Sequence, residues 1–207
     1  MENFIKLGRK IVAVARNYRK HAAELNNPVP EEPMIFLKPT TSYIQEGTVI
    51  RIPPGCDRLF HEVELGLVIG KRGSNISAID SLDYIYGYTL ALDMTARDLT
   101  EVGLPWGISK GFDTACPVSK LITKSVLPKP DNARLWLKVD GVMKQDGNTS
   151  DMVHDIPKLI SYISQFMTLE PGDLILTGTP EGIGPVTSKQ NITCGIDDIL
   201  QMSFNVE

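Results

Sequence analysis

The chain has 207 residues, 42% of them hydrophobic, and a formal net charge of -4 at pH 7. This length suits one well-cored domain spanning residues 1–207. The negative charge and the lack of a concentrated basic face exclude a typical nucleic-acid binder. An odd count of three cysteines without CxxC spacing indicates neither a disulfide framework nor a zinc site.

No targeting or membrane segment stands out in the sequence. The apolar run near the N-terminus, residues 11–15, is too short for the core of a signal peptide. No apolar stretch approaches the about 20 residues that a membrane-spanning helix needs. We therefore expect a cytoplasmic protein with no membrane partner.

The predicted elements are mostly short β-branched and apolar runs bounded by Gly, Pro or Asp, as is typical of strands. In chain order they are strand 10–15, helix 18–25, strands 34–37, 49–52 and 62–69, helix 77–84, strand 86–92, helix 95–102, strand 134–139, helix 155–167, and strands 174–177 and 200–206. Asp140-Gly141 between two apolar runs predicts a type I′ hairpin turn, since both positions need a positive φ. The chain is predicted to be α+β and rich in β-structure.

Two carboxylates, Glu62 and Glu64, lie two residues apart inside a run that is otherwise apolar. Alternation in a strand places both on one face, and His61 on the opposite face, where a structural role is expected. A strand buried on both faces would not tolerate two unpaired carboxylates. Asp93 ends another apolar run, so a cation is expected where the three acids meet. Oxygen ligands of this kind select Mg²⁺, Mn²⁺ or Ca²⁺ over zinc.

The motifs of the chain together resemble the fumarylacetoacetate hydrolase family, and most closely its short acylpyruvase-type branch. The blocks that carry the resemblance run in order over nearly the whole chain: Arg16-Asn17-Tyr18 with His21 and Glu24, Phe36-Leu37-Lys38-Pro39, His61-Glu62-Val63-Glu64-Leu65, Leu92-Asp93-Met94-Thr95-Ala96-Arg97-Asp98, Gly103-Leu104-Pro105-Trp106, Lys110-Gly111-Phe112-Asp113, and Leu176-Thr177-Gly178-Thr179-Pro180-Glu181-Gly182-Ile183-Gly184-Pro185. One departure is Thr100, which stands where relatives carry a substrate-contacting Gln, so the substrate preference is open.

The resemblance implies a mixed β-roll or barrel-like fold with a few short helices, and a homodimer. It implies that Mg²⁺ or Mn²⁺ is bound by Glu62, Glu64 and Asp93, the three acids that the strand pattern also selects. A lid segment at about residues 17–30 would carry a catalytic dyad of His21 and Glu24.

Four further residues receive roles from the same resemblance. Lys110 is assigned to catalysis, and Arg16, Arg97 and Thr179 to substrate binding. Lys110 and Arg97 would place positive charge near a developing oxyanion, where a preorganised donor contributes about 3–4 kcal/mol. The backbone N–H and the hydroxyl of Thr179 would bind a carboxylate oxygen.

The activity implied by this resemblance is hydrolysis of the C–C bond of acylpyruvates such as acetylpyruvate or fumarylpyruvate. The metal would stabilise the departing pyruvate enolate, and His21 would act as general base on a water. Oxaloacetate decarboxylation, tautomerisation or oxo-acid isomerisation uses the same metal enolate and stays an alternative. A non-catalytic metal-binding protein on the same fold is a third.

Overall fold

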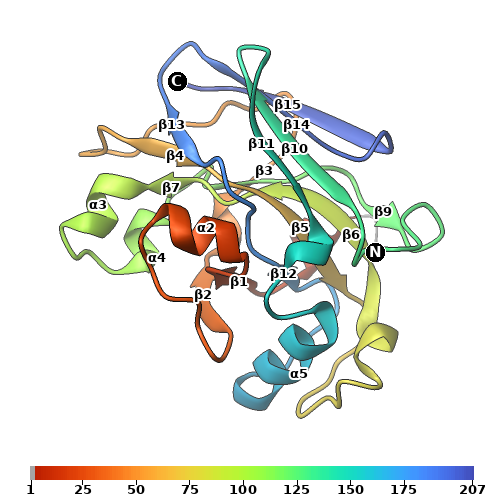
Figure 1. Ribbon diagram of the computed structural model, residues 1–207. Coiled ribbons are helices and arrows are strands. Elements are labelled where there is room, and N and C mark those ends of the chain that lie inside the picture. The colour runs from red at the N-terminus through yellow and green to blue at the C-terminus, as the bar shows by residue number, and fades with distance from the viewer. Residues whose placement is uncertain (1–2) are drawn as a thin grey trace.

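The protein is described here by a computed structural model that covers residues 3–207 and contains four β-sheets (Figure 1). The strands are β1 (Ile11–Ala15), β2 (Met34–Lys38), β3 (Tyr43–Ile44), β4 (Leu59–His61), β5 (Val63–Ile69), β6 (Ile85–Leu92), β7 (Thr95–Ala96), β8 (Cys116–Pro117), β9 (Ile122–Thr123), β10 (Arg134–Val139), β11 (Val142–Asn148), β12 (Leu174–Leu176), β13 (Gly184–Val186), β14 (Asn191–Ile196) and β15 (Leu200–Asn205). The helices are α1 (Phe4–Leu7), α2 (Arg19–Glu24), α3 (Arg97–Glu101), α4 (Trp106–Ser109) and α5 (Ile156–Phe166), with 3₁₀ turns η1 (Thr40–Ser42), η2 (Ser81–Tyr84) and η3 (Thr149–Asp151).

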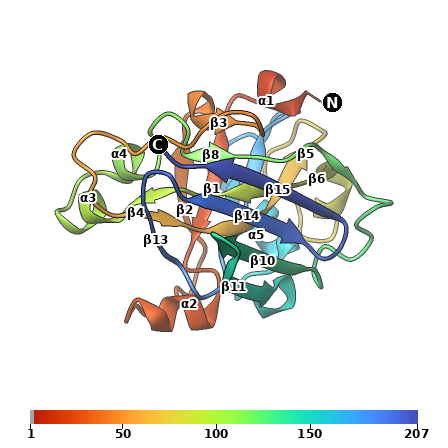
Figure 2. The ribbon, with the colours of Figure 1, turned by 90° about the horizontal axis from the view of Figure 1, so that it is seen from above.

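Two larger sheets form the body of the molecule. One has the order β2-β1-β12-β5-β6-β9, and the other is the antiparallel sheet β11-β10-β14-β15. Within the six-stranded sheet β1 and β12 run parallel, while the neighbouring pairs are antiparallel. Seen from above, the four-stranded sheet lies over the strands of the larger one (Figure 2). The predicted mixed, sheet-rich fold with short helices is confirmed.

Strand β5 is the centre of the core and is buried along its whole length. Leu65, Leu67 and Ile69 face the larger hydrophobic cluster, and Val68 belongs to a smaller cluster. This alternation confirms a strand that is covered on both faces.

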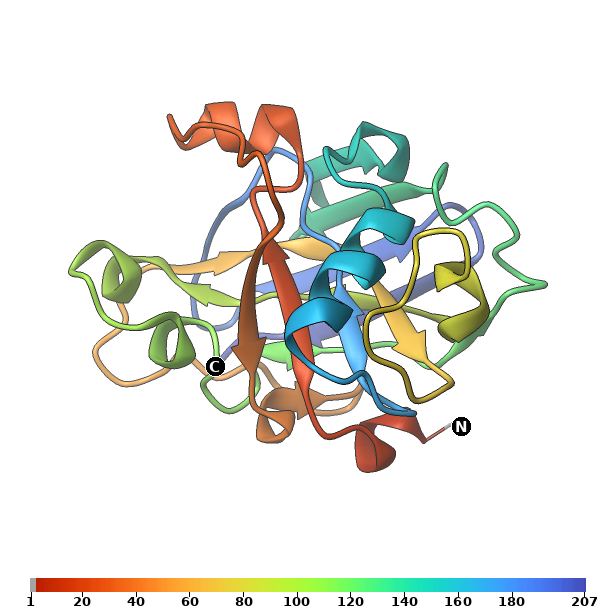
Figure 3. The same cartoon turned by 90° about the horizontal axis from the view of Figure 1, so that it is seen from below.

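Asp155 is the N-cap residue that precedes helix α5, and its side chain accepts a hydrogen bond from the N–H of Lys158. The hydroxyl of Ser164 on this helix accepts a hydrogen bond at 2.9 Å from the N–H of Ile76, which lies in the loop that leads to η2. The view from below shows α5 and this loop side by side (Figure 3). Within residues 3–207 no helix is long and apolar enough to cross a membrane.

The predicted hairpin forms between β10 and β11. Val139 pairs with Val142, and Asp140 and Gly141 adopt φ angles of 49° and 80°. These angles are the positive values that a type I′ turn requires.

Three other predictions need correction, and several strands, β14 among them, were not predicted. The predicted strand 49–52 reduces to a single bridge between Ile50 and Val206, because two prolines follow at once. The predicted helix 77–84 shortens to η2. The first two residues of the predicted helix 95–102 instead pair with β4 as β7. In β14, Gly195 leaves room for Trp136, since a Cβ there would lie 2.3 Å from the indole ring.

Candidate active site

The candidate site lies at one end of the six-stranded sheet and is assembled by strand register. Val63, at the start of β5, pairs with Leu92, at the end of β6, so Glu62 and Asp93 become neighbours. The N–H of Asp93 donates to the carbonyl of Glu62 at 2.8 Å. Strand β12 pairs with β5 on its other side, which brings Gly178 to Glu64. Sequentially distant residues therefore meet at this end.

Three carboxylates converge there and are almost fully buried. Glu62, Glu64 and Asp93 each offer an oxygen, and these oxygens lie within 4.8 Å of one another. Their exposed fractions are 4%, 1% and 1%. Buried carboxylates this close repel one another unless cations neutralise them.

Three buried or half-buried cations contact this acidic cluster. Lys38 Nζ lies 2.5 Å from one oxygen of Asp93, and Lys110 Nζ lies 2.6 Å from the other. Lys110 also donates to Glu62 at 3.0 Å and to the hydroxyl of Thr95 at 2.8 Å. Since an ammonium has three hydrogens, the donors of Lys110 are all taken. Arg97 Nη2 lies 2.5 Å from Glu62.

The two glutamates differ in their electrostatic environment. Burial raises the pKa of Glu62, but the charges of Lys110 and Arg97 outweigh it and lower the pKa to about 2. Burial, followed by the negative charges of Asp93 and Glu62, raises the pKa of Glu64 well above its ordinary value. Its hydrogen-bond donor is the N–H of Gly178 at 2.7 Å. A dication next to Glu64 would remove this repulsion, and the all-oxygen donor set fits Mg²⁺ or Mn²⁺.

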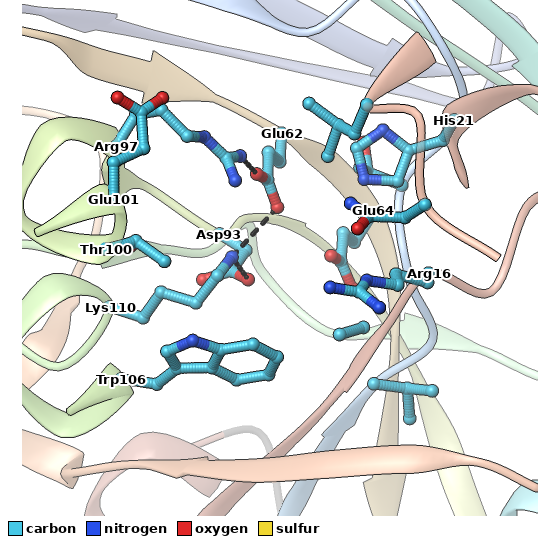
Figure 4. Close-up of a pocket in the computed structure, with 15 residues that line it drawn as sticks. Arg16, His21, Glu62, Glu64, Asp93, Arg97, Thr100, Glu101, Trp106 and Lys110 are labelled. Atoms are coloured by element: carbon cyan, nitrogen blue, oxygen red, sulfur yellow. Dashed lines mark hydrogen bonds and ion pairs between the residues drawn. The ribbon is translucent and has the colours of Figure 1, made fainter. Parts of the chain in front are cut away.

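A cavity of about 250 Å³ opens beside the acidic cluster (Figure 4). Its lining includes eight of the nine residues that the sequence singled out: Arg16, His21, Glu62, Glu64, Asp93, Arg97, Lys110 and Thr179. Thr100, where relatives were expected to carry Gln, lines it too. The cavity is smaller than the about 300–1,000 Å³ of pockets for drug-sized ligands, which suits a compact metabolite.

The ninth residue, Glu24, is not among the lining residues. Its carboxylate accepts a hydrogen bond from the N–H of Gly182 at 3.2 Å and lies 3.7 Å from Nδ1 of His21. His21 is 5% exposed, and burial is the largest influence that lowers its pKa. Helix α2 thus carries His21 to the cavity, while Glu24 contacts the loop after β12. The catalytic roles given to both residues stay predictions.

Arg16 differs from the other cations of the cavity. Among residues 3–207 it makes no ion pair within 4.0 Å, whereas Arg97 and Lys110 are both paired with Glu62. Its backbone is in the left-handed region, with φ at 57°, which is uncommon for residues other than glycine. Arg16 extends into the cavity beside Glu64 (Figure 4). Strain of this kind clusters at ligand sites, so Arg16 is a candidate ligand contact.

Sequence reasoning left two residues of the site without a role. Lys38 is 1% exposed and binds Asp93, and the signal for it was a lone lysine at the end of an apolar strand. Trp106 lines the cavity and contacts Phe36 edge to face at 5.2 Å. His61, predicted to be structural, is buried away from the cavity and hydrogen-bonds Gln145 at 3.0 Å.

The sheet-rich fold places a buried cluster of three carboxylates, which could hold a divalent cation, beside a small-molecule cavity. Residues 10–206 match the family described as fumarylacetoacetate (FAA) hydrolase C-terminal. The chain therefore belongs to the fumarylacetoacetate hydrolase family, a family of enzymes.

Two curated relatives and one solved structure are similar to this chain over nearly its whole length. The chain is 53% identical to "Oxaloacetate decarboxylase, mitochondrial" of Dictyostelium discoideum, over all of this chain and 97% of that protein. It is 53% identical to "Oxaloacetate tautomerase FAHD1, mitochondrial" of Arabidopsis thaliana, over all of this chain and 95% of that protein. A fumarylpyruvate hydrolase of Pseudomonas aeruginosa, solved with Mn²⁺ and pyruvate, is 34% identical and superposes with a TM-score of 0.89, over 96% of this chain and 89% of that one.

The names of these relatives correct one prediction. The curated relatives are named as mitochondrial, which contradicts the predicted cytoplasmic location. The prediction was wrong because it tested only for apolar runs, whereas mitochondrial transit peptides are amphipathic and rich in Arg and Ser.

Proposed function

We propose that this protein acts on oxaloacetate, interconverting its enol and keto forms at a divalent-metal site formed by Glu62, Glu64 and Asp93. Decarboxylation of oxaloacetate at the same site is the closest related reaction. The observation that carries the proposal is the balance of buried charge around the cavity, together with the unpaired Arg16.

The charge balance favours a substrate with two carboxylates. The three acids are matched by three cations, Lys38, Lys110 and Arg97, so a bound dication and the guanidinium of Arg16 in the cavity wall leave an excess of three positive charges. A dianion such as oxaloacetate offsets two of these charges, whereas acetylpyruvate, with one carboxylate, offsets only one. Arg16 has no ion-pair partner among residues 3–207, and its planar fork suits a carboxylate.

The curated relatives support the same substrate. Two proteins that are 53% identical over the full chain are named for oxaloacetate, one as a decarboxylase and one as a tautomerase.

The metal and the residues of the cavity wall have separate roles in this reaction. A bound dication supplies a Lewis acid that stabilises negative charge on the 2-oxo oxygen.

The side chains around the cavity have different roles. Lys38, Lys110 and Arg97 hold the side-chain carboxylates of Glu62 and Asp93 in place. Arg16 binds the carboxylate of the substrate that is distant from the oxo group. His21, buried and at the cavity wall, moves the proton between the enol hydroxyl and carbon 3.

Acylpyruvate hydrolysis is the second candidate function. The similarity to a fumarylpyruvate hydrolase favours it, as does the position of His21 with Glu24 behind it. Fumarylpyruvate, unlike acetylpyruvate, is also a dianion, so the charge balance admits it.

A substrate panel separates these functions. Enol oxaloacetate, fumarylpyruvate and acetylpyruvate are each supplied with Mg²⁺ or Mn²⁺, and with chelator as control. Ketonisation is followed by loss of enol absorbance, and decarboxylation or cleavage by release of pyruvate. We expect the highest kcat/KM for oxaloacetate and loss of turnover in His21→Ala. A higher kcat/KM for fumarylpyruvate would replace the proposal with hydrolysis, and no metal-dependent turnover of any of the three would favour a non-catalytic protein.

We also propose a homodimer, whose support is a set of exposed apolar side chains on elements that contact one another. Leu37 on β2, Ile108 on α4 and Val102 after α3 are 49%, 53% and 75% exposed. Analytical ultracentrifugation tests it: a monomer at micromolar concentration would refute the dimer.

A further inference from the structure

Gln145 of β11 is a fully buried polar residue that the activity described above does not use. Its exposed fraction is 0%, and it is not part of the cavity wall. Its side chain makes four contacts. The oxygen Oε1 accepts from the N–H of Val63 at 3.1 Å and contacts Nδ1 of His61 at 3.0 Å. The nitrogen Nε2 donates to the hydroxyl of Thr179 at 2.8 Å and to the carbonyl of Pro180 at 3.0 Å. The amide therefore has no hydrogen-bonding capacity left.

The backbone partners fix the polarity of this network. The N–H of Val63 can only donate and the carbonyl of Pro180 can only accept, so the amide of Gln145 has one orientation. His61 must then carry its hydrogen on Nδ1. The hydroxyl of Thr179 must accept from Gln145, and its own hydrogen goes to the carbonyl of Val63 at 2.8 Å.

This polarity changes the expected role of Thr179 in the cavity wall. Its hydroxyl has no hydrogen left for a ligand, contrary to the expectation from the sequence. Its backbone N–H makes no hydrogen bond within residues 3–207. At this position the N–H is thus the donor that stays available to an anionic ligand.

Close packing between β11 and the loop after β12 supports the same arrangement. A Cβ on Gly147 would lie 2.4 Å from Cβ of Pro180, and one on Gly182 would lie 2.1 Å from the carbonyl oxygen of Lys144. Both distances are far below ordinary contact. Strand β11 therefore supports the loop on both sides of Gln145, and Gln145 supplies the directional contacts to it.

We propose that Gln145 is a positioning residue that holds the loop at Thr179 and Pro180, so that the backbone N–H of Thr179 meets a carboxylate or oxo oxygen of the bound ligand. Thr179 contacts the ligand through its backbone N–H, and its hydroxyl accepts the hydrogen bond from Gln145 that holds the loop in place. This inference rests on the proposed function for the identity of the ligand, an oxo acid, but not for the geometry of the loop.

The test compares Gln145→Met with a variant that loses a buried hydrogen bond elsewhere. Thr149→Val is the matched control, because its hydroxyl is buried, accepts from the N–H of Ala133 at 2.8 Å and does not line the cavity. The affinity for oxalate, an unreactive mimic of a 2-oxo carboxylate, is measured by calorimetry on the Mn²⁺-loaded proteins. The melting temperature and the Mn²⁺ affinity are measured alongside.

We expect Gln145→Met to raise the Kd of oxalate about tenfold, the usual effect of one lost hydrogen bond. Thr149→Val should also lower the melting temperature but leave this Kd within about twofold. Thr179→Val keeps the N–H and loses the hydroxyl, so it breaks the contact between Gln145 and Thr179 but leaves that between Gln145 and Pro180, and it should raise the Kd in the same direction. The effect in the double variant should be less than additive, because the link between Gln145 and Thr179 is already broken in each single variant. Equal oxalate affinity in Gln145→Met and Thr149→Val, or additive effects in the double variant, would overturn the inference.

A second measurement does not depend on the ligand. Hydrogen–deuterium exchange of the metal-free protein should become faster in residues 177–184 of Gln145→Met, but not of Thr149→Val. If the wild-type protein bound neither Mn²⁺ nor oxalate, the proposed function would fail, and unchanged exchange in this segment would separately refute the positioning role.

Discussion

Replacing Arg16 with glutamine tests whether the substrate carries a second carboxylate. The guanidinium lines the cavity and has no ion-pair partner among residues 3–207, so the substitution breaks no ion pair of the protein. A hydrogen bond to a charged group contributes about 1.5–3 kcal/mol. The kcat/KM for oxaloacetate should therefore fall about 10- to 150-fold, at 1.4 kcal/mol for each factor of ten.

The assay pairs two substrates and two variants. Oxaloacetate has the second carboxylate and acetylpyruvate lacks it, so Arg16→Gln should lower turnover of the first and leave the second within about twofold. Arg72→Gln is the control, because Arg72 is 72% exposed and pairs with Glu170 outside the cavity. An equal loss for both substrates, or no loss for either, would show that Arg16 does not bind that carboxylate.

Three further predictions concern the metal, the stability and the pH dependence. Glu64→Gln removes a charge from the acidic cluster and should weaken Mn²⁺ binding at least about tenfold in calorimetry while the protein stays folded; unchanged affinity would exclude Glu64 as a ligand. Asp173→Asn should lower the free energy of unfolding in urea by about 3–5 kcal/mol, because this carboxylate is 0% exposed, pairs with Lys10 and accepts from the N–H of Arg9 at 2.9 Å. The exposed Asp146→Asn, which breaks a surface pair, should cost less than about 1 kcal/mol, and similar losses in the two variants would contradict this account. Burial raises the pKa of Cys194, so the unfolded chain loses this thiol proton first and stability should fall as pH rises above about 8.5, by up to about 1.4 kcal/mol per pH unit. Urea titrations at pH 8 to 10 should show that the free energy of unfolding declines less steeply with pH in Cys194→Ala than in the wild type. An equal slope in the two proteins would show that Cys194 does not cause the decline.

Local patterns were enough to predict several elements. The apolar runs at β1, β5 and β6 form strands that are buried almost continuously, and β10 buries alternate side chains, as their sequence patterns predict. The turn at Asp140-Gly141 could be predicted from the sequence, because its positive φ angles depend on these two residues. Short elements whose pairing comes from distant segments were less predictable, as with β7, which pairs with β4.

The contacts of single side chains were also hard to predict where they involve distant segments. The sequence indicated that Glu62, Glu64 and Asp93 would need a cation, because acids in apolar runs are costly to bury. A lone lysine at the end of an apolar strand marked Lys38, but nothing in the sequence indicated that its partner is Asp93, or that every hydrogen of Lys110 is already taken. A side chain's partners depend on which strands become neighbours.

By itself the sequence determined the family, the sheet-rich fold and the acidic character of the site, because these follow from motif order, alternation and residue chemistry. The tertiary structure decided the pairing of Val63 with Leu92 that brings Glu62 beside Asp93, and the contact of β11 with the loop at Thr179. Strand register and long-range packing depend on the summed burial of many residues, and no short segment carries that information.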